Sequence, residues 1–216
     1  MVQKSLNVAL GESAAKVKVK LFSYIVRHDI GFAPNPFYGW CTLGPCKPAI
    51  RRAADVGDWI IGTGSRTNNI EGRLVYAMRV QEILGFDAYW NDVRFIQKRP
   101  NLRGSLKQSF GDNIYHREEC DEWIQENSRH SLEDGSPNLG HIKADTGVDA
   151  VLVGQEFVYF GRHGPKIPDN IRATSSMDTV HSGRGHRCKF SPTQVRDVVA
   201  WIQELDGGVQ GIPFDW

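Results

Sequence analysis

The hydrophobic positions of the chain fall into short runs, which predict a sheet built from short strands. Residues 21–26 and 59–62 are apolar runs of the length of buried strands. Over residues 73–84 large side chains occupy alternate positions, which predicts one long strand. The remaining segments with a strand pattern are 16–20, 149–154 and 155–160.

Helical patterns are fewer. Residues 191–205 carry the strongest one, because Ser191 suits an N-cap, Pro192 suits the first turn, and valines recur on one face. Weaker patterns predict helices at 48–54, 87–98 and 118–126. Polar, glycine-rich stretches predict loops, and they cover residues 31–45, 66–72, 127–145 and 161–185. We expect 127–145 to be a long mobile loop, and we expect Phe214 and Trp216 to pack back on the body.

Strands and helices do not alternate strictly, so a doubly wound fold is excluded and an α+β fold with a mostly antiparallel sheet is expected. The length of 216 residues favours a single domain over residues 1–216. Hydrophobic residues make up 40% and charged residues 24%, as in ordinary globular proteins. The net charge of +1 excludes a strong overall field, so any surface for nucleic acid must be a local patch.

Localisation follows from what the sequence lacks. No apolar run approaches the roughly 20 residues that cross a bilayer, and the first residues do not show the pattern of a signal peptide. We therefore expect a cytoplasmic protein without membrane contact, whose four cysteines are reduced thiols.

Residues 24–65 combine ionisable groups with an aromatic loop, and we predict the functional face there. Arg27, His28 and Asp29 follow the first buried strand. An arginine offers planar donors to a phosphate or base edge, and His28 with Asp29 could form an acid/base pair. The alternative is an ordinary strand end with a capping aspartate.

The loop that follows could stack on a base and read its edge. Its candidate ligand-binding residues are Phe32, Asn35, Phe37 and Trp40. Some of these rings are instead expected to fill the core. Lys47 and Arg51 are spaced to share one helix face near its start, where an anion could bind. Thr63 and Ser65 lie in a Gly-Thr-Gly-Ser segment that would let a ligand approach the backbone.

A basic stretch follows further along the chain and contains no acidic residue. It could track a nucleic-acid backbone through Arg94, Lys98, Arg99, Arg103 and Lys107. The alternative is a solvated face.

Metal and cofactor chemistry are not predicted. Cys41 and Cys46 lack the short Cys-x-x-Cys spacing of zinc sites, so the cysteines are interpreted as buried and structural. The sequence also shows no recognisable nucleophile signature with a cysteine or serine beside a histidine. We therefore expect neither a metal nor a cofactor.

Three segments between residues 27 and 65 carry a family resemblance, and they read RHDIGFAPNPF, CTLGPCKPAIRR and VGDWIIGTGS. They resemble the second family of nucleotide modification associated domains, which is thought to be related to the PUA, ASCH and EVE domains. The resemblance implies a PUA-like, mostly antiparallel β-pseudobarrel with a few flanking helices and a mouth that holds a base or nucleotide. It also implies a setting of DNA base modification or phage–host conflict.

Three functional hypotheses remain open. The first is binding, with or without processing, of a nucleotide or modified base, either free or within DNA or RNA. The second is an enzyme that acts on a nucleotide or base with His28 and Asp29 as its acid/base pair. The third is an interaction module whose aromatic loop contacts a protein.

Overall fold

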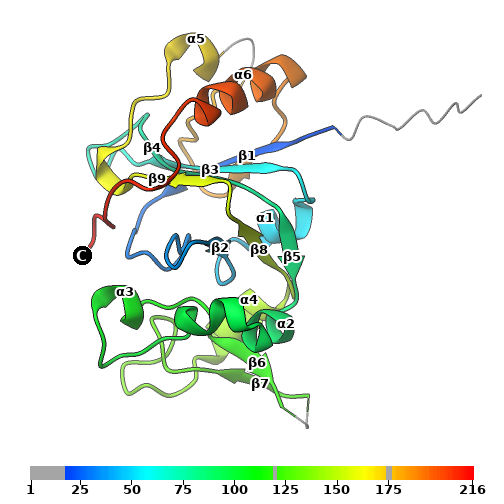
Figure 1. The fold of residues 1–216 in the computed structure, drawn as a ribbon, viewed down its shortest axis with the longest axis vertical. Coiled ribbons are helices and arrows are strands. Elements are labelled where there is room, and N and C mark those ends of the chain that lie inside the picture. Colours follow the sequence, from blue (N-terminus) through cyan, green and yellow to red (C-terminus); the bar gives the residue numbers. More distant parts are fainter. Residues whose placement is uncertain (1–17, 119–120, 174–176) are drawn as a thin grey trace, which may run out of the picture.

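The computed structural model describes residues 18–118, 121–173 and 177–216. Its largest element is a six-stranded sheet, which lies in the upper half of Figure 1. In spatial order the strands are β10 (His186–Arg187), β1 (Leu21–Val26), β3 (Trp59–Gly64), β4 (Leu74–Arg79), β9 (Phe157–Tyr159) and β11 (Gly208–Val209). β1 runs parallel to β3 and β9 runs parallel to β11, whereas the other neighbours are antiparallel.

A second, three-stranded sheet has the order β2 (Cys41–Leu43), β8 (Val151–Gly154) and β5 (Glu82–Leu84). The two sheets are continuous at two corners, because β4 leads into β5 and β8 leads into β9. Gln81 joins these corners, since its Oε1 accepts hydrogen bonds from the backbone N–H groups of Gln155 and Glu156. The two connections between the sheets are therefore held side by side.

The lower half of Figure 1 holds a hairpin and short helices. The hairpin pairs β6 (Tyr115–Arg117) with β7 (Trp123–Gln125). The helices of the chain are α1 (Pro48–Ala53), α2 (Phe86–Asn91), the 3-10 helix η1 (Val93–Lys98), α3 (Leu106–Ser109), α4 (Leu139–Thr146), the 3-10 helix η2 (Gly161–His163), α5 (Asp169–Arg172) and α6 (Pro192–Gln203).

Both faces of the main sheet are buried, which explains its nearly continuous apolar strands. α6 covers one face, where Val195, Val198 and Ile202 pack with Leu21 and Ile61. The other face carries a core that includes Phe22, Tyr24, Tyr76, Met78, Leu43 and Ile50. β1 is therefore held rigidly, and its C-terminal end is a fixed point from which the next residues project.

The mixed α+β class and the single sheet formed by β1, β3 and β4 confirm the predictions for these strands. The predicted helices at 48–54 and 191–205 are also confirmed, and Ser191 accepts a hydrogen bond from the N–H of Gln194. Phe214 packs on the core and Trp216 stacks on Phe37, as expected for the tail. Within the described residues the sheets are open, and no closed barrel is present.

Six predicted elements differ from the structure. Two of them are predicted loops, because 31–45 contains β2 and 161–185 contains η2 and α5. The long strand 73–84 is two strands, because the chain passes from one sheet to the other at Val80 and Gln81. The helix 87–98 breaks at Asp92, whose carboxylate caps η1 by accepting from the N–H of Arg94. The described part of 118–126 forms β7 rather than a helix, since Trp123 and Ile124 pair with β6.

The predicted loop 127–145 ends in α4, which Asn138 caps through two backbone N–H groups. The predictions for residues 1–17 lie outside the described residues, and these include the first two positions of the predicted strand 16–20. Residues 18–20 of that prediction are described and form no strand, because β1 begins only at Leu21. Among the described helices, none is both long and apolar enough to cross a bilayer.

Candidate functional site

A cavity of about 620 Å³ opens beside the C-terminal end of β1. Four parts of the chain form its walls: the end of β1 with the loop after it, the residues just before α1, residues 129–131 with His141 of α4, and residues 183–185. Tyr24 and Phe32 contribute aromatic surface to the lining. A rigid strand end thus meets three loops, the arrangement in which binding residues are usually found.

Cations dominate the polar lining of this cavity. Arg27, Lys47, Arg129 and Arg184 line it, together with three histidines, and no carboxylate is among the described lining residues. Burial lowers the pKa of Lys47, and the charge of Arg27 lowers it further. The ammonium group lies 4.5 Å from the centre of the Tyr24 ring. Because the cations disfavour one another, an anion in the cavity would relieve their repulsion.

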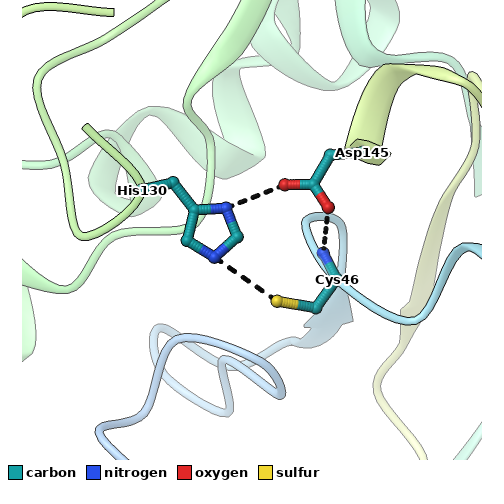
Figure 2. A group of neighbouring side chains, drawn as sticks. All are labelled: Cys46, His130 and Asp145. Carbon is teal, nitrogen blue, oxygen red and sulfur yellow. Dashed lines mark hydrogen bonds and ion pairs between the residues drawn. The ribbon is translucent and has the colours of Figure 1, made fainter. Parts of the chain in front are cut away.

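A thiol and an imidazole of one wall lie in a row with a buried carboxylate behind them (Figure 2). Sγ of Cys46 lies 3.4 Å from Nε2 of His130, and Nδ1 of His130 lies 2.8 Å from Oδ2 of Asp145. Oδ1 of Asp145 accepts a hydrogen bond of 2.8 Å from the backbone N–H of Cys46. The three residues come from the segment before α1, the loop before α4, and α4 itself.

Several buried groups fix the carboxylate end of this row. The hydroxyl of Tyr115 donates to Oδ2 of Asp145 at 2.9 Å, and the amide of Gln125 donates to that hydroxyl at 3.1 Å. The amide of Gln125 also donates to the carbonyl oxygen of His130. The hairpin β6–β7 therefore positions both His130 and Asp145.

Arg51 ties the thiol segment to α4. Its guanidinium is fully buried and donates to the carbonyl oxygens of Cys46, Asp145, Val148 and Ala150. Two parts of the chain that are distant in sequence are thereby held together at the point where Cys46 meets Asp145.

The backbone around the thiol is strained. Cys46 has φ 66° and Lys47 has φ 46°, both in the left-handed region that side chains other than glycine rarely adopt. Two such residues in succession turn the chain sharply before Pro48 begins α1. This turn directs the Cys46 side chain toward His130 (Figure 2).

The surroundings favour a protonated imidazole. Burial lowers the pKa of His130, but hydrogen bonds to the carboxylate of Asp145 and the sulfur of Cys46 outweigh it and raise the pKa to about 9. Burial raises the pKa of Asp145, and the bond to His130 reverses this and holds it below the ordinary value. His141, whose ring lies 4.1 Å from that of His130, has its pKa lowered by burial and by the His130 charge.

The whole described body matches one family model, that of nucleotide modification associated domain 2, over residues 18–216. The chain belongs to this family. No curated protein and no solved structure matches the chain. Family membership confirms the resemblance drawn from residues 27–65 and extends it to the segments that supply His130 and Asp145.

A metal ion does not fit the row well. Ligand atoms of Cys46, His130 and Asp145 lie within 4.8 Å of one another. However, both oxygens of Asp145 already accept hydrogen bonds, and one of them engages Nδ1 of His130. Only Sγ and Nε2 remain free to face a shared ion, whereas zinc takes three or four protein ligands. The chemistry of the donor set is that of a proton relay.

Four of the predicted ligand-binding residues line the cavity, namely Arg27, His28, Phe32 and Lys47. The structure does not bring the others to it. Phe37 is buried beneath Trp216, and Trp40 packs against Phe95 and Arg94. Arg51, Thr63 and Ser65 are buried inside the fold.

Asn35 and Lys98 form a structural pair. Both are fully buried, and the ammonium of Lys98 donates to the side-chain and backbone oxygens of Asn35. Lys98 therefore cannot reach the backbone of a nucleic acid. Of the rest of that basic stretch, Arg94 pairs with Glu82 and Asp92, Arg99 lies over Trp90, Lys107 lies over Tyr38, and Arg103 is exposed.

His28 and Asp29 do not form the predicted pair. Asp29 is buried and accepts from the hydroxyl of Tyr159, whereas the exposed ring of His28 lies 3.7 Å from Asp215. Cys41 is buried, as predicted, but Cys46 is only partly buried and lines the cavity. Cys120 lies outside the described residues.

Sequence reasoning missed the row because its members are far apart. Cys46 and His130 are separated by 84 positions, and no motif connects them. The signals were present only singly: a cysteine before a proline-initiated helix, and a histidine in a polar stretch interpreted as a mobile loop.

Proposed function

We propose that this protein binds a phosphorylated nucleotide or modified nucleotide in the cavity at the end of β1. The observation that carries the proposal is the cationic lining, in which Arg27, Lys47, Arg129 and Arg184 face a space without a carboxylate among its described residues. Membership of the nucleotide modification family supports a nucleotide over other anions. Tyr24 and Phe32 supply the apolar surface that a base or sugar would contact.

A small ligand is favoured over a polymer as the primary ligand. The cations are grouped around one cavity, while the basic stretch 94–107 is largely engaged in internal pairs and stacks. The interaction-module hypothesis is weakened because Phe37 is buried beneath Trp216 and Trp40 packs against Phe95 and Arg94. We also propose a kinship with PUA-like domains, which would place a base at the mouth of a curved sheet. The passage of the chain from one sheet to the other between β4 and β5 and between β8 and β9 supports this proposal.

The test is a titration with deoxynucleoside monophosphates and with the matching nucleosides. We expect saturable binding of the monophosphates and at least about tenfold weaker binding of the nucleosides, because hydrogen bonds to charged groups contribute about 1.5–3 kcal/mol. Arg27→Ala and Lys47→Ala should each weaken binding of the monophosphate by a similar factor. Arg103→Ala is the matched control, because Arg103 is an exposed arginine outside the cavity.

An oligonucleotide titrated in parallel separates polymer from small ligand. Binding that falls steeply with salt and weakens in Arg103→Ala would place the ligand on the 94–107 surface instead. Equal binding of nucleoside and monophosphate in the wild type would refute the phosphate part of the proposal.

A further inference from the structure

Cys46, His130 and Asp145 have the geometry of a nucleophile, a base and an orienting carboxylate. The carboxylate holds Nδ1 of His130 at 2.8 Å, so Nε2 is the ring nitrogen directed at the sulfur. A proton on Nε2 can then pass between the sulfur and a group bound beside it. Thiol and imidazole both line the cavity, so a bound ligand can reach both.

The electrostatics agree with this arrangement. His130 has a pKa of about 9 after burial is outweighed by its two hydrogen bonds, so the imidazolium is present at neutral pH. Nε2 of His130 faces the sulfur, so the ring can take up and return the proton of the thiol. The charged or titratable groups around the ring are Cys46, Asp145, His141 and Arg129.

We infer that Cys46 is the nucleophile of a thiol-dependent hydrolase that removes an acyl group from a nucleotide. The nucleotide part of this substrate rests on the proposed function, whereas the thiol chemistry rests on the row itself. We favour an acyl carbon as the site of attack, because His130 can give the proton on Nε2 to a leaving group that must be protonated to depart. Addition of a thiolate to a ring carbon of a base requires no such group.

The reaction balances with water as the only co-reactant. The Cys46 thiolate attacks the carbonyl carbon of an amide, an S–C bond forms, and the C–N bond breaks. The leaving amine takes the proton from Nε2 of His130. Water then attacks the thioester, gives one proton to Nε2, and the C–S bond breaks to release the carboxylic acid and restore the thiolate.

Asp145 is a positioning residue in this scheme. It fixes the ring of His130 and stabilises the imidazolium without touching the substrate. Its second oxygen, by accepting from the N–H of Cys46, also holds the thiol at the same distance from the ring.

The first test measures the thiol without any nucleotide. The full chain is alkylated with iodoacetamide between pH 5 and 10, and each cysteine is followed by peptide mass spectrometry. His130→Asn should slow alkylation of Cys46 at pH 7 by at least about tenfold, because it removes the imidazole that can take the proton from the thiol. Cys188→Ser is the control variant, because Cys188 packs on the core and should not affect Cys46.

The second test measures turnover, with N4-acetyl-deoxycytidine 5′-monophosphate and the matching nucleoside as probes. The wild type should release acetate from the monophosphate, and Cys46→Ser should lose at least about a hundredfold of this rate while still binding the probe. Melting curves show whether Cys46→Ser is folded. Hydroxylamine should trap the acyl group from the wild type but not from Cys46→Ser.

The outcomes separate the two proposals. Equal turnover of monophosphate and nucleoside, with a reactive Cys46, supports the thiol inference and refutes the phosphate site. Binding of the monophosphate without acetate release or a trapped acyl group refutes the acyl inference and leaves the nucleotide site standing. Alkylation of Cys46 at the same rate in wild type and in His130→Asn, across the pH range, overturns the nucleophile assignment.

Discussion

Two histidine–aspartate combinations in this protein look different in sequence and in structure. His28 and Asp29 are adjacent at the end of β1, yet their side chains contact different partners, Asp215 and Tyr159. His130 and Asp145 are separated by 15 positions, yet their side chains are hydrogen-bonded at 2.8 Å. The separated residues are hydrogen-bonded to each other, and the adjacent ones are not.

The difference follows from backbone geometry. Successive residues of an extended chain point to opposite sides, so neighbours at a strand end are poorly placed to pair. Pairing at a distance needs fixed supports, and the His130–Asp145 pair has them in Tyr115, Gln125 and Arg51. Substitutions of these supporting residues, and of the two aspartates, can therefore test the difference between the two His–Asp combinations.

The largest effect is expected for Arg51→Met, which removes the tie between the Cys46 segment and α4. The variant leaves four buried carbonyl oxygens without their donor, so the free energy of unfolding should fall by about 3–5 kcal/mol. Urea unfolding measures this loss. Arg52→Met is the control, because Arg52 is exposed on the same helix, and an equal loss there would show that the buried contacts of Arg51 are unimportant.

Asp145→Asn and Asp29→Asn should have opposite effects on stability at pH 7. Loss of the Asp145 charge leaves a buried imidazole without its partner and should cost about 3 kcal/mol. Among the described residues no cation is paired with Asp29. Burial, only partly offset by Tyr159, raises its pKa to about 6, so Asn should stabilise the fold by about 1–3 kcal/mol. Where Asp145→Asn folds, alkylation of Cys46 at pH 7 should also become slower, which a purely structural role would not cause.

The pH dependence of stability should show two windows. His130 has a folded-state pKa of about 9 against an ordinary 6.5, so its contribution is complete below pH 6.5 and is lost as pH rises through 9. Asp29 has a folded-state pKa of about 6 against 3.8, so its contribution is present below pH 3.8 and is lost as pH rises through 6. The urea midpoint of the wild type should fall as pH rises through each range. This fall between pH 6.5 and 9 should be absent in His130→Gln, and the fall between pH 3.8 and 6 should be absent in Asp29→Asn. A wild type with no slope between pH 6.5 and 9 would contradict the ion pair.

The smallest effect is expected for His28→Gln. Its ring is exposed and its contact with Asp215 is 3.7 Å long, so the melting temperature should not change measurably. Because His28 lines the cavity, the affinity for a deoxynucleoside monophosphate should fall only a few-fold. A large loss of turnover in this variant, with normal binding, would instead restore His28 as an acid or base.

Local patterns predicted the elements whose cause is local. Ser191, Pro192 and the valine stripe define α6, and the apolar run 21–26 defines β1. β7 could not be predicted in this way, because Trp123 packs on Phe86 and pairs with β6, contacts that outweigh the helical preference of its acidic neighbours.

The same limit applies to the candidate site. Arg27, His28, Phe32 and Lys47 lie near one another in sequence, so a local interpretation found them beside the cavity. Cys46 is adjacent to Lys47 in sequence, yet the sequence favours a structural role for it, because its chemical environment depends on His130 and Asp145, which only the fold brings close. Likewise, the basic stretch 94–107 does not indicate by its sequence which of its side chains is buried. The structure shows that Lys98 is.

The left-handed backbone at Cys46 and Lys47 has a consequence for protein engineering. A search for stabilising substitutions would select glycine or asparagine at both positions, since they adopt positive φ at the least cost. Such a variant would melt at a higher temperature and would lose the thiol and a cation of the cavity together. A design campaign scored on thermal tolerance alone would therefore select against the two side chains that we propose act on the ligand.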